Sequence, residues 1–420
     1  MASLDEILAG RQKRKEQIDL MTVTNGCVVA VRANVPGPDK TTPAARYVVG
    51  RFAAALHAGA TVVATDENAD GPFFLASFPD VSPKAKKAES VQAEEASPLG
   101  RLADIDVYDD IGTVFSRGTL RRCYVCDEAA VVCGRLRKHS HKELLAAMNA
   151  IVDADAYGFA FDLIDRAIRT ELDLDPKFGL VTPTSPGSHP DMNYRLMTEA
   201  KKAIVPFLAQ MFVLGLRNDS VSETLVNARN IGVAAERAMF VATAGVNAYK
   251  GLIFSMGLAA TSAGRIIASG LPFMAVFDEI ARLAAPLASD SIQGDPLTAG
   301  GKAWHDFAIG GARREAAAGM PSVQKALAWI GQGKLDDQYR TLCGLIGIVE
   351  DTVLFKRAGT RERYDEIRSL FAGRTDFSLE SMASMTRICL QDGLSFGGSA
   401  DLFAVTVFLQ ELRDAFVFRA

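Results

Sequence analysis

Hydrophobic and polar residues follow two different periods along the chain, and the change comes near residue 140. Before that point, short apolar or alternating runs predict four strands, at residues 27–32, 60–65, 73–78 and 102–108. Helical spacing predicts helices over residues 1–20 and 43–58, while the polar residues 82–96 fit either a helix or a loop. Residues 34–40 must form a turn, because two prolines flank a glycine there.

After residue 140, strand patterns almost vanish, and segments rich in alanine, leucine, isoleucine and methionine recur at helical spacing. They predict helices at residues 141–172, 191–217, 222–268, 272–287, 302–317, 321–331, 335–357, 361–371, 378–392 and 399–418. We therefore expect an α+β domain over residues 1–147, built from a mixed sheet with helices. A larger all-α domain should follow over residues 150–420.

Composition predicts a folded, soluble protein. Hydrophobic residues make up 49% and charged residues 23% of the 420 positions, which excludes disorder over most of the chain. The formal net charge of −4 argues against a globally basic nucleic-acid-binding protein. Six cysteines are too few for a disulfide scaffold, and charged residues near the start replace the apolar run of a signal peptide. We therefore expect a cytoplasmic protein.

The most apolar stretch, residues 238–277, raises the question of a membrane span. It is interrupted by Lys250 and Arg265. A membrane-spanning helix needs about 20 mostly apolar residues without charges. We therefore expect buried helices here and no membrane contact.

The first candidate for chemistry is a pair of acidic residues in the predicted strand 102–108. Asp104 and Asp106 are two positions apart, so both carboxylates lie on one face of a strand. Such close carboxylates repel unless a cation lies between them, and Mg²⁺ commonly combines one or two carboxylates with substrate phosphates. The pair suits nucleotidyl transfer, in which the metal neutralises the phosphates and the leaving pyrophosphate. On spacing alone, the polar outer face of an edge strand is the simpler interpretation.

Basic residues follow the predicted turn at residues 34–40. The rigid turn presents Lys40, and Arg46 lies in the helix after it. A rigid turn followed by a basic residue suits a triphosphate. A connecting turn with solvated charges is the alternative.

Three cysteines and a histidine follow at the spacing C-x2-C-x6-C-x5-H, namely Cys123, Cys126, Cys133 and His139. They suit a structural Cys₃His zinc site, although the spacing is looser than that of a standard zinc knuckle. Thiols that pack as small hydrophobic groups are the favoured alternative. Residues 117–142 carry seven basic and two acidic side chains, a local charge of +5 that suits a polyphosphate or an acidic protein partner.

Two polar patterns stand out in the helical half. Arg229, Glu236, Thr243 and Lys250 recur every seven residues, near one line on a helix. Because a buried lysine must be paired or bind an anion, this stripe predicts either a polar cleft or one ion pair of Lys250 with a carboxylate from another helix.

The second pattern is a glycine-rich helix start made of Gly397, Gly398, Ser399 and Asp401. Glycines let backbone N–H groups approach a ligand, and a helix N-terminus favours phosphate. An ordinary serine cap with a dipole-favoured aspartate is the alternative.

Together these motifs resemble two families that make and attach the prosthetic group of citrate lyase. The N-terminal half is similar to the holo-acyl-carrier-protein synthases, or phosphoribosyl-dephospho-CoA transferases, at residues 34–40 (NVPGPDK), 98–106 (PLGRLADID) and 121–139. The C-terminal half resembles the triphosphoribosyl-dephospho-CoA synthases at residues 176–181, 187–192, 247–257 (NAYKGLIFSMG), 311–321, 351–359 and 394–404 (LSFGGSADLFA). The order matches that of natural fusions of the two families.

The resemblance implies two successive reactions. In the C-terminal domain, the 2′-hydroxyl of 3′-dephospho-CoA attacks C1′ of the ribose of ATP, and adenine leaves while the triphosphate is retained. In the N-terminal domain, which would be nucleotidyltransferase-like, a serine of the acyl carrier (gamma) subunit of citrate lyase attacks the α-phosphate and expels pyrophosphate. Carboxylates would stabilise the oxocarbenium-like transition state of the first reaction, with a metal on the triphosphate.

The resemblance also implies residue roles. In the N-terminal half, Asp104 and Asp106 would hold Mg²⁺ and act in catalysis, while Lys40, Arg46 and Arg101 would bind phosphates. In the C-terminal half, the catalytic carboxylates would be Glu315, Asp351 and Asp401. The residues that would bind ATP and dephospho-CoA there are Lys177, His189, Asn247, Lys250, Arg313, Gly397, Gly398 and Ser399.

Three positions depart from the motifs of the synthase family. Thr182 stands where the family usually has aspartate, Tyr249 stands where it usually has histidine, and the asparagine that usually follows Asp351-Thr352 is missing. These departures leave open a single-activity transferase whose helical domain has become a binding module. A separate alternative is the equivalent pair of activities for malonate decarboxylase, although the Cys-x2-Cys segment favours the citrate lyase branch.

Overall fold

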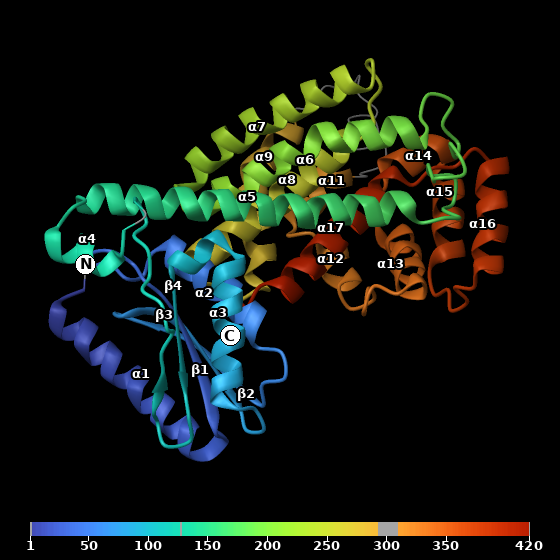
Figure 1. The fold of residues 1–420 in the computed structure, drawn as a ribbon. Coiled ribbons are helices and arrows are strands. Elements are labelled where there is room, and N and C mark those ends of the chain that lie inside the picture. Colours follow the sequence, from blue (N-terminus) through green and yellow to red (C-terminus); the bar gives the residue numbers. More distant parts are fainter. Residues whose placement is uncertain (1, 127, 293–309, 420) are drawn as a thin grey trace. The chain divides into compact units, whose positions relative to one another are not determined.

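The computed structural model describes residues 2–126, 128–292 and 310–419 (Figure 1). The chain divides into two compact units, and each is described here by itself. Unit 1 comprises Met1–Ala156, Ile266–Phe273 and Arg413–Ala420, and unit 2 comprises Tyr157–Arg265 and Met274–Leu412. The boundary that the sequence predicts, between residues 147 and 150, lies inside one helix, α5 (His141–Asp173).

A five-stranded antiparallel sheet forms the centre of unit 1. Its strands are β1 (Cys27–Ala33), β2 (Val62–Asn68), β3 (Gly71–Phe78), β4 (Ala103–Tyr108) and β5 (Val114–Phe115), in the order β2-β3-β1-β4-β5. The expectation of a mixed sheet is wrong for these strands, since every pairing between them is antiparallel. The reason is the tight hairpin between β2 and β3, which turns the chain back so that β3 pairs with β1.

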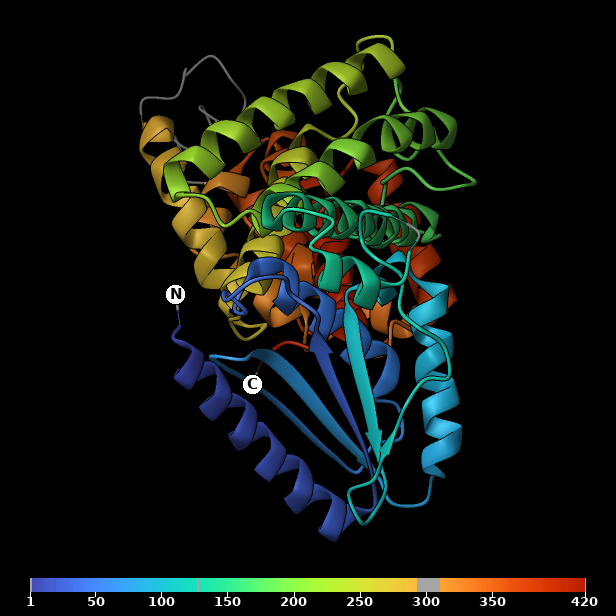
Figure 2. The same ribbon diagram turned by 60° about the vertical axis from the view of Figure 1, so that its left-hand side comes forward.

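Helix α1 (Leu4–Asn25) covers one face of this sheet, as Figure 2 shows. It starts with a capping box in which Ser3 and Glu6 satisfy each other's backbone N–H groups. Ile18 and Met21 pack against alternate residues of the strands, such as Val28 and Leu75. The period of two therefore sends every second strand residue toward α1.

Two further helices cover the opposite face. Helix α2 (Pro43–Leu56) begins with a Thr42 cap and a proline in its first turn. Residues 82–96, left open between helix and loop, form helix α3 (Pro83–Ala96). The ammonium of Lys86 in α3 lies 3.9 Å from the ring centre of Phe78, whose side chain points away from α1 because it is an odd number of positions from Leu75.

The two late segments of unit 1 complete its apolar core. Phe416 packs against Tyr47 of α2, with ring centres 6.0 Å apart, and Phe273 packs against Phe418 at 5.3 Å. An ideal Cβ placed on Gly50 would lie 2.1 Å from Cζ of Phe416. Only glycine at that position leaves room for the ring.

Unit 2 is built from helices. Those described are the C-terminal part of α5, α6 (Tyr194–Leu216), α7 (Val221–Ala242), α8 (Lys250–Ser269) as far as Arg265, α9 (Ala275–Ile292), α11 (Gly311–Ala317), α12 (Pro321–Ala326), α13 (Leu335–Ile348), α14 (Thr352–Ala358), α15 (Arg361–Phe371), α16 (Leu379–Gln391) and α17 (Gly397–Ala415) as far as Leu412. The all-α character expected after residue 150 is confirmed for the described residues. Part of the helix predicted at residues 302–317 lies outside them.

Two helices expected to be continuous are broken. The segment 222–268 divides because Ala244 and Gly245 adopt positive φ angles of 52° and 93°, and Asn247 caps α8 through the backbone N–H of Lys250. The segment 335–357 divides because Val349 is extended and Asp351 caps α14. Both breaks bring polar residues to helix starts.

Helices α5 and α8 are long and apolar enough to cross a membrane, judged by length and composition alone. The most apolar window of α8 is 89% buried inside the protein, as expected for residues 238–277, and that of α5 is 28% buried. One or two such helices are weak evidence for a membrane span, because core helices of water-soluble proteins can have the same length and composition.

A buried ion pair joins α8 to α9 and generates the first prediction. The Arg265 guanidinium contacts Glu279, and both side chains are 6% exposed. We expect Glu279→Gln to cost about 3–5 kcal/mol of unfolding free energy, because it leaves a buried positive charge without its partner. Urea unfolding followed by helical circular dichroism measures this loss. The control Glu366→Gln breaks the exposed pair with Arg363 and should change little; equal losses would contradict the prediction.

Candidate active sites

The acidic pair of unit 1 lies on one face of β4. Asp104 and Asp106 are opposite Arg32 and Ala30 of β1 in the sheet register. The Arg32 guanidinium contacts the carboxylates of both, at 3.4 Å for Asp106, and the two acids are 29% and 28% exposed. The repulsion between the carboxylates is therefore offset by an arginine, and both remain accessible.

Further cations surround this pair. Arg121 Nη2 lies 3.1 Å from Asp104 Oδ1. Arg14 contacts Asp70 at 2.6 Å, and Arg32 lies 4.0 Å from the same carboxylate. Burial lowers the pKa of Lys40, while the charge of Asp70 acts in the opposite direction. The Lys40 ammonium itself donates to the backbone carbonyl of Val35 at 2.5 Å, so the structure places Lys40 near Asp70 and does not bring it into contact with the acidic pair.

Three sequence motifs meet at a cavity of about 790 Å³ in unit 1. The lining includes residues from the turn at 34–40, from the short helix η1 (Pro98–Arg101) and from the cysteine-rich segment, namely Asn34, Pro36, Gly37, Arg101, Arg121, Arg122, Arg137, His139 and His141. Arg101 Nη1 donates to the Cys123 carbonyl at 3.3 Å. The basic lining makes the cavity suitable for a polyphosphate.

Arg46 differs from the expectation of a phosphate contact beside Lys40. Its guanidinium binds the Glu67 carboxylate through Nε at 2.6 Å and Nη2 at 2.8 Å, and it also donates to the Ala268 carbonyl. Arg46 lines a different, small cavity of about 50 Å³ in unit 1. A bidentate ion pair already satisfies this side chain.

A second large cavity, of about 630 Å³, lies in unit 2. Eight of the predicted site residues line it: His189, Asn247, Lys250, Glu315, Asp351, Gly397, Gly398 and Asp401. Glu171, Tyr249, Ser255 and Glu350 join them. The lining is rich in carboxylates, and Lys250 is its one basic residue apart from His189 among the described residues.

Asp351 organises one wall of this cavity. Its carboxylate is buried and accepts four hydrogen bonds: from the backbone N–H groups of Val353 and Leu354 at the start of α14, and from the N–H and hydroxyl of Ser399 in α17 at 2.8 and 3.0 Å. Burial raises the pKa of Asp351, and these donors oppose the rise. Asp351 and Ser399 therefore fix two helix starts against each other, and the backbone N–H of Ser399 is occupied.

Asp401 lies two positions after Ser399 in α17. An ideal Cβ on Gly251 would lie 2.2 Å from Asp401 Oδ2, so the carboxylate rests directly against the start of α8. Burial, followed by the charges of Glu171 and Asp351, raises the pKa of Asp401 well above its ordinary value. The hydroxyl of Tyr249 is buried with no hydrogen-bond partner among the described residues. Tyr249 and Asp401 thus offer polar groups to whatever fills the cavity.

Glu315 and His189 complete the titratable lining. Burial raises the pKa of Glu315, whose Oε1 accepts the backbone N–H of Ser322 at 2.7 Å. Burial and the charge of Arg357 lower the pKa of His189, and its Nε2 lies 2.8 Å from the Ser395 hydroxyl. Burial therefore shifts the pKa of each group in the direction of its neutral form.

The polar stripe predicted in the helical half becomes a single ion pair. Lys250 Nζ lies 3.2 Å from Glu236 Oε2 of α7, and the lysine side chain is 57% exposed. The chain break before α8 takes Lys250 out of the core. Its ammonium can therefore reach an anion in the cavity without the cost of a buried charge.

Two predicted phosphate contacts do not reach this cavity. Lys177 is buried, and its ammonium binds both the carboxylate of Glu171, at 2.8 Å, and the Glu171 backbone carbonyl. Arg313 is exposed on the short helix α11 and does not line the cavity. Glu171 lines the cavity, and the buried lysine neutralises its carboxylate from behind the wall.

Several residues of the two sites are not among those predicted from the sequence. Arg32 and Arg121 contact the acidic pair, and Glu171 and Ser255 line the second cavity. The register of β1 against β4 would have paired Arg32 with Asp104 had the sheet order been known. Nothing in the local pattern distinguishes Ser255, because it lies in an apolar helix.

Each half of the chain matches one family model. Residues 2–155 match the CitX model, described as apo-citrate lyase phosphoribosyl-dephospho-CoA transferase. Residues 160–419 match the CitG model, described as ATP:dephospho-CoA triphosphoribosyl transferase.

Curated relatives cover the chain. It is 31% identical to "Protein CitXG" of Haemophilus influenzae over 79% of this chain and 78% of that protein. It is 28% identical to "Protein CitXG" of Leuconostoc mesenteroides over 98% and 97%. The "2-(5''-triphosphoribosyl)-3'-dephosphocoenzyme-A synthase" of Haemophilus ducreyi is 31% identical over 69% of this chain and 99% of its own length.

The raised pKa of Asp401 generates a pH-dependent prediction. A carboxyl group with a higher pKa in the folded than in the unfolded state stabilises the fold below its unfolded pKa, and that contribution is lost as the pH rises through the folded pKa. We expect Asp401→Asn to abolish this loss. The variant should therefore gain thermal stability over the wild type as the pH rises above about 4, with roughly 2–4 °C in Tm for each kcal/mol relieved.

The measurement is the Tm of the full chain at a series of pH values. Glu380→Gln, at an exposed carboxyl of α16, is the control, and its curve should run parallel to that of the wild type. A difference between Asp401→Asn and wild type that stays constant with pH would refute the prediction.

Proposed function

The chain belongs to the family of fused CitX and CitG proteins that mature citrate lyase, and from this premise we propose which residues carry out its two reactions. The helical cavity would join ATP to 3′-dephospho-CoA with release of adenine. The cavity beside the sheet would transfer the phosphoribosyl-dephospho-CoA group to a serine of the acyl carrier subunit with release of pyrophosphate. Both reactions would take place in the cytoplasm.

The convergence of eight motif residues on one cavity of unit 2 is the observation that carries the synthase proposal. Displacement of adenine at C1′ leaves positive charge on the ribose, which nearby carboxylates stabilise. Asp401 and Glu315 face the cavity, and their raised pKa values suit proton exchange with the 2′-hydroxyl and the leaving adenine. Asp351 would position Asp401 by fixing the start of α17.

The triphosphate of ATP would lie toward Lys250 and the glycines at the start of α17. Lys250 is exposed enough to move from Glu236 to a phosphate, and Gly397 and Gly398 line the cavity at a helix N-terminus. Lys177 would act indirectly, by neutralising from behind the wall the carboxylate of Glu171, which lines the cavity. Asn247 would hold the start of α8, while His189 would donate or accept a hydrogen bond as a neutral ring.

The transferase proposal rests on the acidic pair and the basic cavity of unit 1. Two part-exposed carboxylates on one strand face offer the oxygen ligands that Mg²⁺ prefers, so Asp104 and Asp106 fit that ion. When bound, Mg²⁺ would neutralise charge on the phosphates. Arg32, Arg121 and Lys40 would orient the polyphosphate, and Arg101 would support it from the cavity wall.

One assay separates this proposal from the single-activity alternative. Tyr249 and Thr182 replace residues that are usual in the synthase family. These two replacements are the reason to test the alternative, a transferase with a divergent helical domain. Purified protein with Mg²⁺, ATP and dephospho-CoA should release free adenine. Transfer of a supplied triphosphoribosyl cofactor without adenine release would instead support the alternative. Apo-carriers of citrate lyase and malonate decarboxylase, offered in parallel, identify the acceptor.

Gly251 provides a steric test of Asp401. An alanine methyl group would collide with the Asp401 carboxylate, and a displacement of about 1 Å can reduce a reaction roughly 100-fold. We expect Gly251→Ala to lower adenine release by about that factor.

Gly158→Ala is the matched control, because a Cβ there meets nothing within 4 Å. It should leave adenine release unchanged and stabilise α5 by about 0.5–1 kcal/mol. Equal adenine release by both variants would remove Asp401 from the proposed machinery.

Substitutions of the acidic pair test whether the two sites are separate. We expect Asp104→Asn or Asp106→Asn to reduce transfer to the carrier by roughly 100-fold or more while adenine release continues, because each removes a charged ligand from unit 1 alone. Radiolabel transferred to the apo-carrier and adenine measured by chromatography provide the two readouts. Asp110→Asn, in the exposed loop after β4, is the control. Loss of both activities would contradict separate sites.

A further inference from the structure

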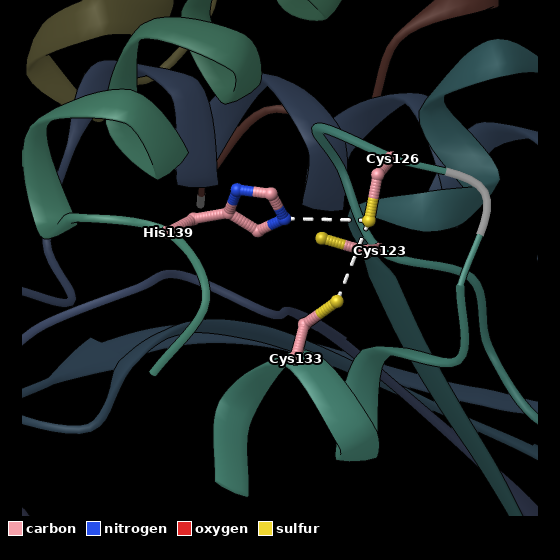
Figure 3. Close-up of side chains that lie close together, drawn as sticks. All are labelled: Cys123, Cys126, Cys133 and His139. Carbon is pink, nitrogen blue, oxygen red and sulfur yellow. Dashed lines mark hydrogen bonds between the residues drawn. The ribbon is translucent and has the colours of Figure 1, made fainter. Parts of the chain in front are cut away.

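Three thiols and one imidazole lie close together in unit 1 and form a cluster that does not include the acidic pair. The ligand atoms of Cys123, Cys126, Cys133 and His139 all lie within 4.8 Å of one another (Figure 3). Cys126 Sγ is 3.4 Å from Cys133 Sγ and 3.3 Å from His139 Nε2. A tetrahedron with Zn–S bonds of about 2.3 Å has sulfur–sulfur edges of about 3.8 Å. The four groups therefore already have the spacing of a metal-binding tetrahedron.

Local backbone structure produces this convergence. A small antiparallel turn places Cys123 and Cys126 together, closed by the bridge between Arg122 and Ala129 and by the bond from Cys123 N to the Glu128 carbonyl. Backbone N–H groups of Val125 and Cys126 point to the sulfur of Cys123. Such N–H···S bonds satisfy a thiolate that also binds a metal.

The other two groups come from the helix that follows. Cys133 lies in α4 (Ala130–Leu136), and Arg137 ends this helix in a left-handed conformation with φ 48°. The Lys138 backbone N–H bonds to the Cys133 carbonyl at 3.0 Å, and the reversed chain returns His139 to the cysteines. A non-glycine residue is thus held at positive φ where the return is needed.

We propose that Cys123, Cys126, Cys133 and His139 bind one structural Zn²⁺ ion. Four protein ligands fill the tetrahedral shell, as in closed structural sites, so this ion would have no open position for substrate. Binding would form three Zn–S bonds and one Zn–N bond, and the protons of the three thiols would pass to solvent.

The favoured interpretation from the sequence, thiols packed as small hydrophobic groups, explains less. It accounts for the buried Cys123 and Cys133, but Cys126 and His139 are only partly buried. A half-exposed imidazole directed at a sulfur adds nothing to apolar packing, whereas both are ligands that Zn²⁺ prefers. The cysteine spacing looked loose because the helical turn of α4 and the reversal at Arg137 take up the intervening residues.

The ion would hold together the wall of the basic cavity. Cys123, Cys133 and His139 line that cavity, and the segment around them carries Arg121, Arg122 and Arg137. The same segment contacts both N-terminal motifs: Arg101 donates to the Cys123 carbonyl, and the Tyr124 hydroxyl donates to the Asn34 carbonyl. Without a crosslink, a segment with only one short helix would have to hold several like charges in place.

Metal content of the untagged full-length protein is the direct test. We expect about one Zn²⁺ per chain after growth in zinc-containing medium, and loss of most of it in Cys126→Ser and His139→Ala. His139→Cys should retain zinc, because a Cys₄ set binds it equally well. Cys27→Ala, at a buried thiol of the same unit outside the cluster, is the matched control and should also retain zinc.

A second measurement does not depend on whether the variants fold. Co²⁺ exchanged into the wild-type chain should produce the intense visible bands of a tetrahedral, thiolate-rich site, and addition of Zn²⁺ should abolish them. Three results would overturn the proposal: metal-free protein with every thiol titratable, a Cys126–Cys133 disulfide in anaerobically purified protein, or zinc that persists in both Cys126→Ser and His139→Ala.

The functional consequence rests on the transferase activity proposed above. Removal of zinc should reduce transfer to the carrier while adenine release continues, since the cluster belongs to unit 1. Zinc present in a protein that shows no transfer would leave this inference standing and refute the proposed function. Transfer by a protein without zinc would do the reverse.

Discussion

Closely spaced carboxylates need a neutralising partner, and both candidate sites are built around this constraint. In the sheet unit the partner is a guanidinium: Arg32 lies opposite Asp104 in the register and contacts Asp106 as well. In the helical unit the partners are backbone and hydroxyl donors at Asp351 and an ammonium at Glu171, while burial and the neighbouring carboxylates raise the pKa of Asp401. The arrangement of each cavity follows from how its charges are balanced.

The two solutions suit different chemistry. A permanent positive charge can be displaced from a carboxylate by a divalent ion that arrives with a polyphosphate, and the displaced arginine can then contact the phosphates. A proton on a half-buried carboxyl can instead be exchanged with a reacting group. The first arrangement is appropriate to attack at phosphorus, and the second to displacement of a base from a sugar.

The sequence predicted those parts of the structure that depend on neighbouring residues. The placement of Asp104 and Asp106 on one strand face, for example, follows from a period of two. Contacts between residues that are far apart in the chain could not be predicted from the sequence. The Ser399 partner of Asp351 lies 48 positions away, and Lys177 looked available for phosphate because its pairing with Glu171 depends on the turn after α5. The break before α8 was missed because the left-handed conformation at Ala244 overrides a helical pattern that otherwise continues.

The segments Ile266–Phe273 and Arg413–Ala420 belong to the unit that the first 156 residues begin. The Phe416 ring fills the space above Gly50, and the Ala268 carbonyl accepts a hydrogen bond from Arg46. A gene cut after residue 156 would therefore release a fragment with an uncovered aromatic-binding groove and an unsatisfied guanidinium donor. Unit 1 thus includes two segments from the part of the chain that matches the CitG model, and a division of the chain into its two matched parts would expose the apolar surface of α2.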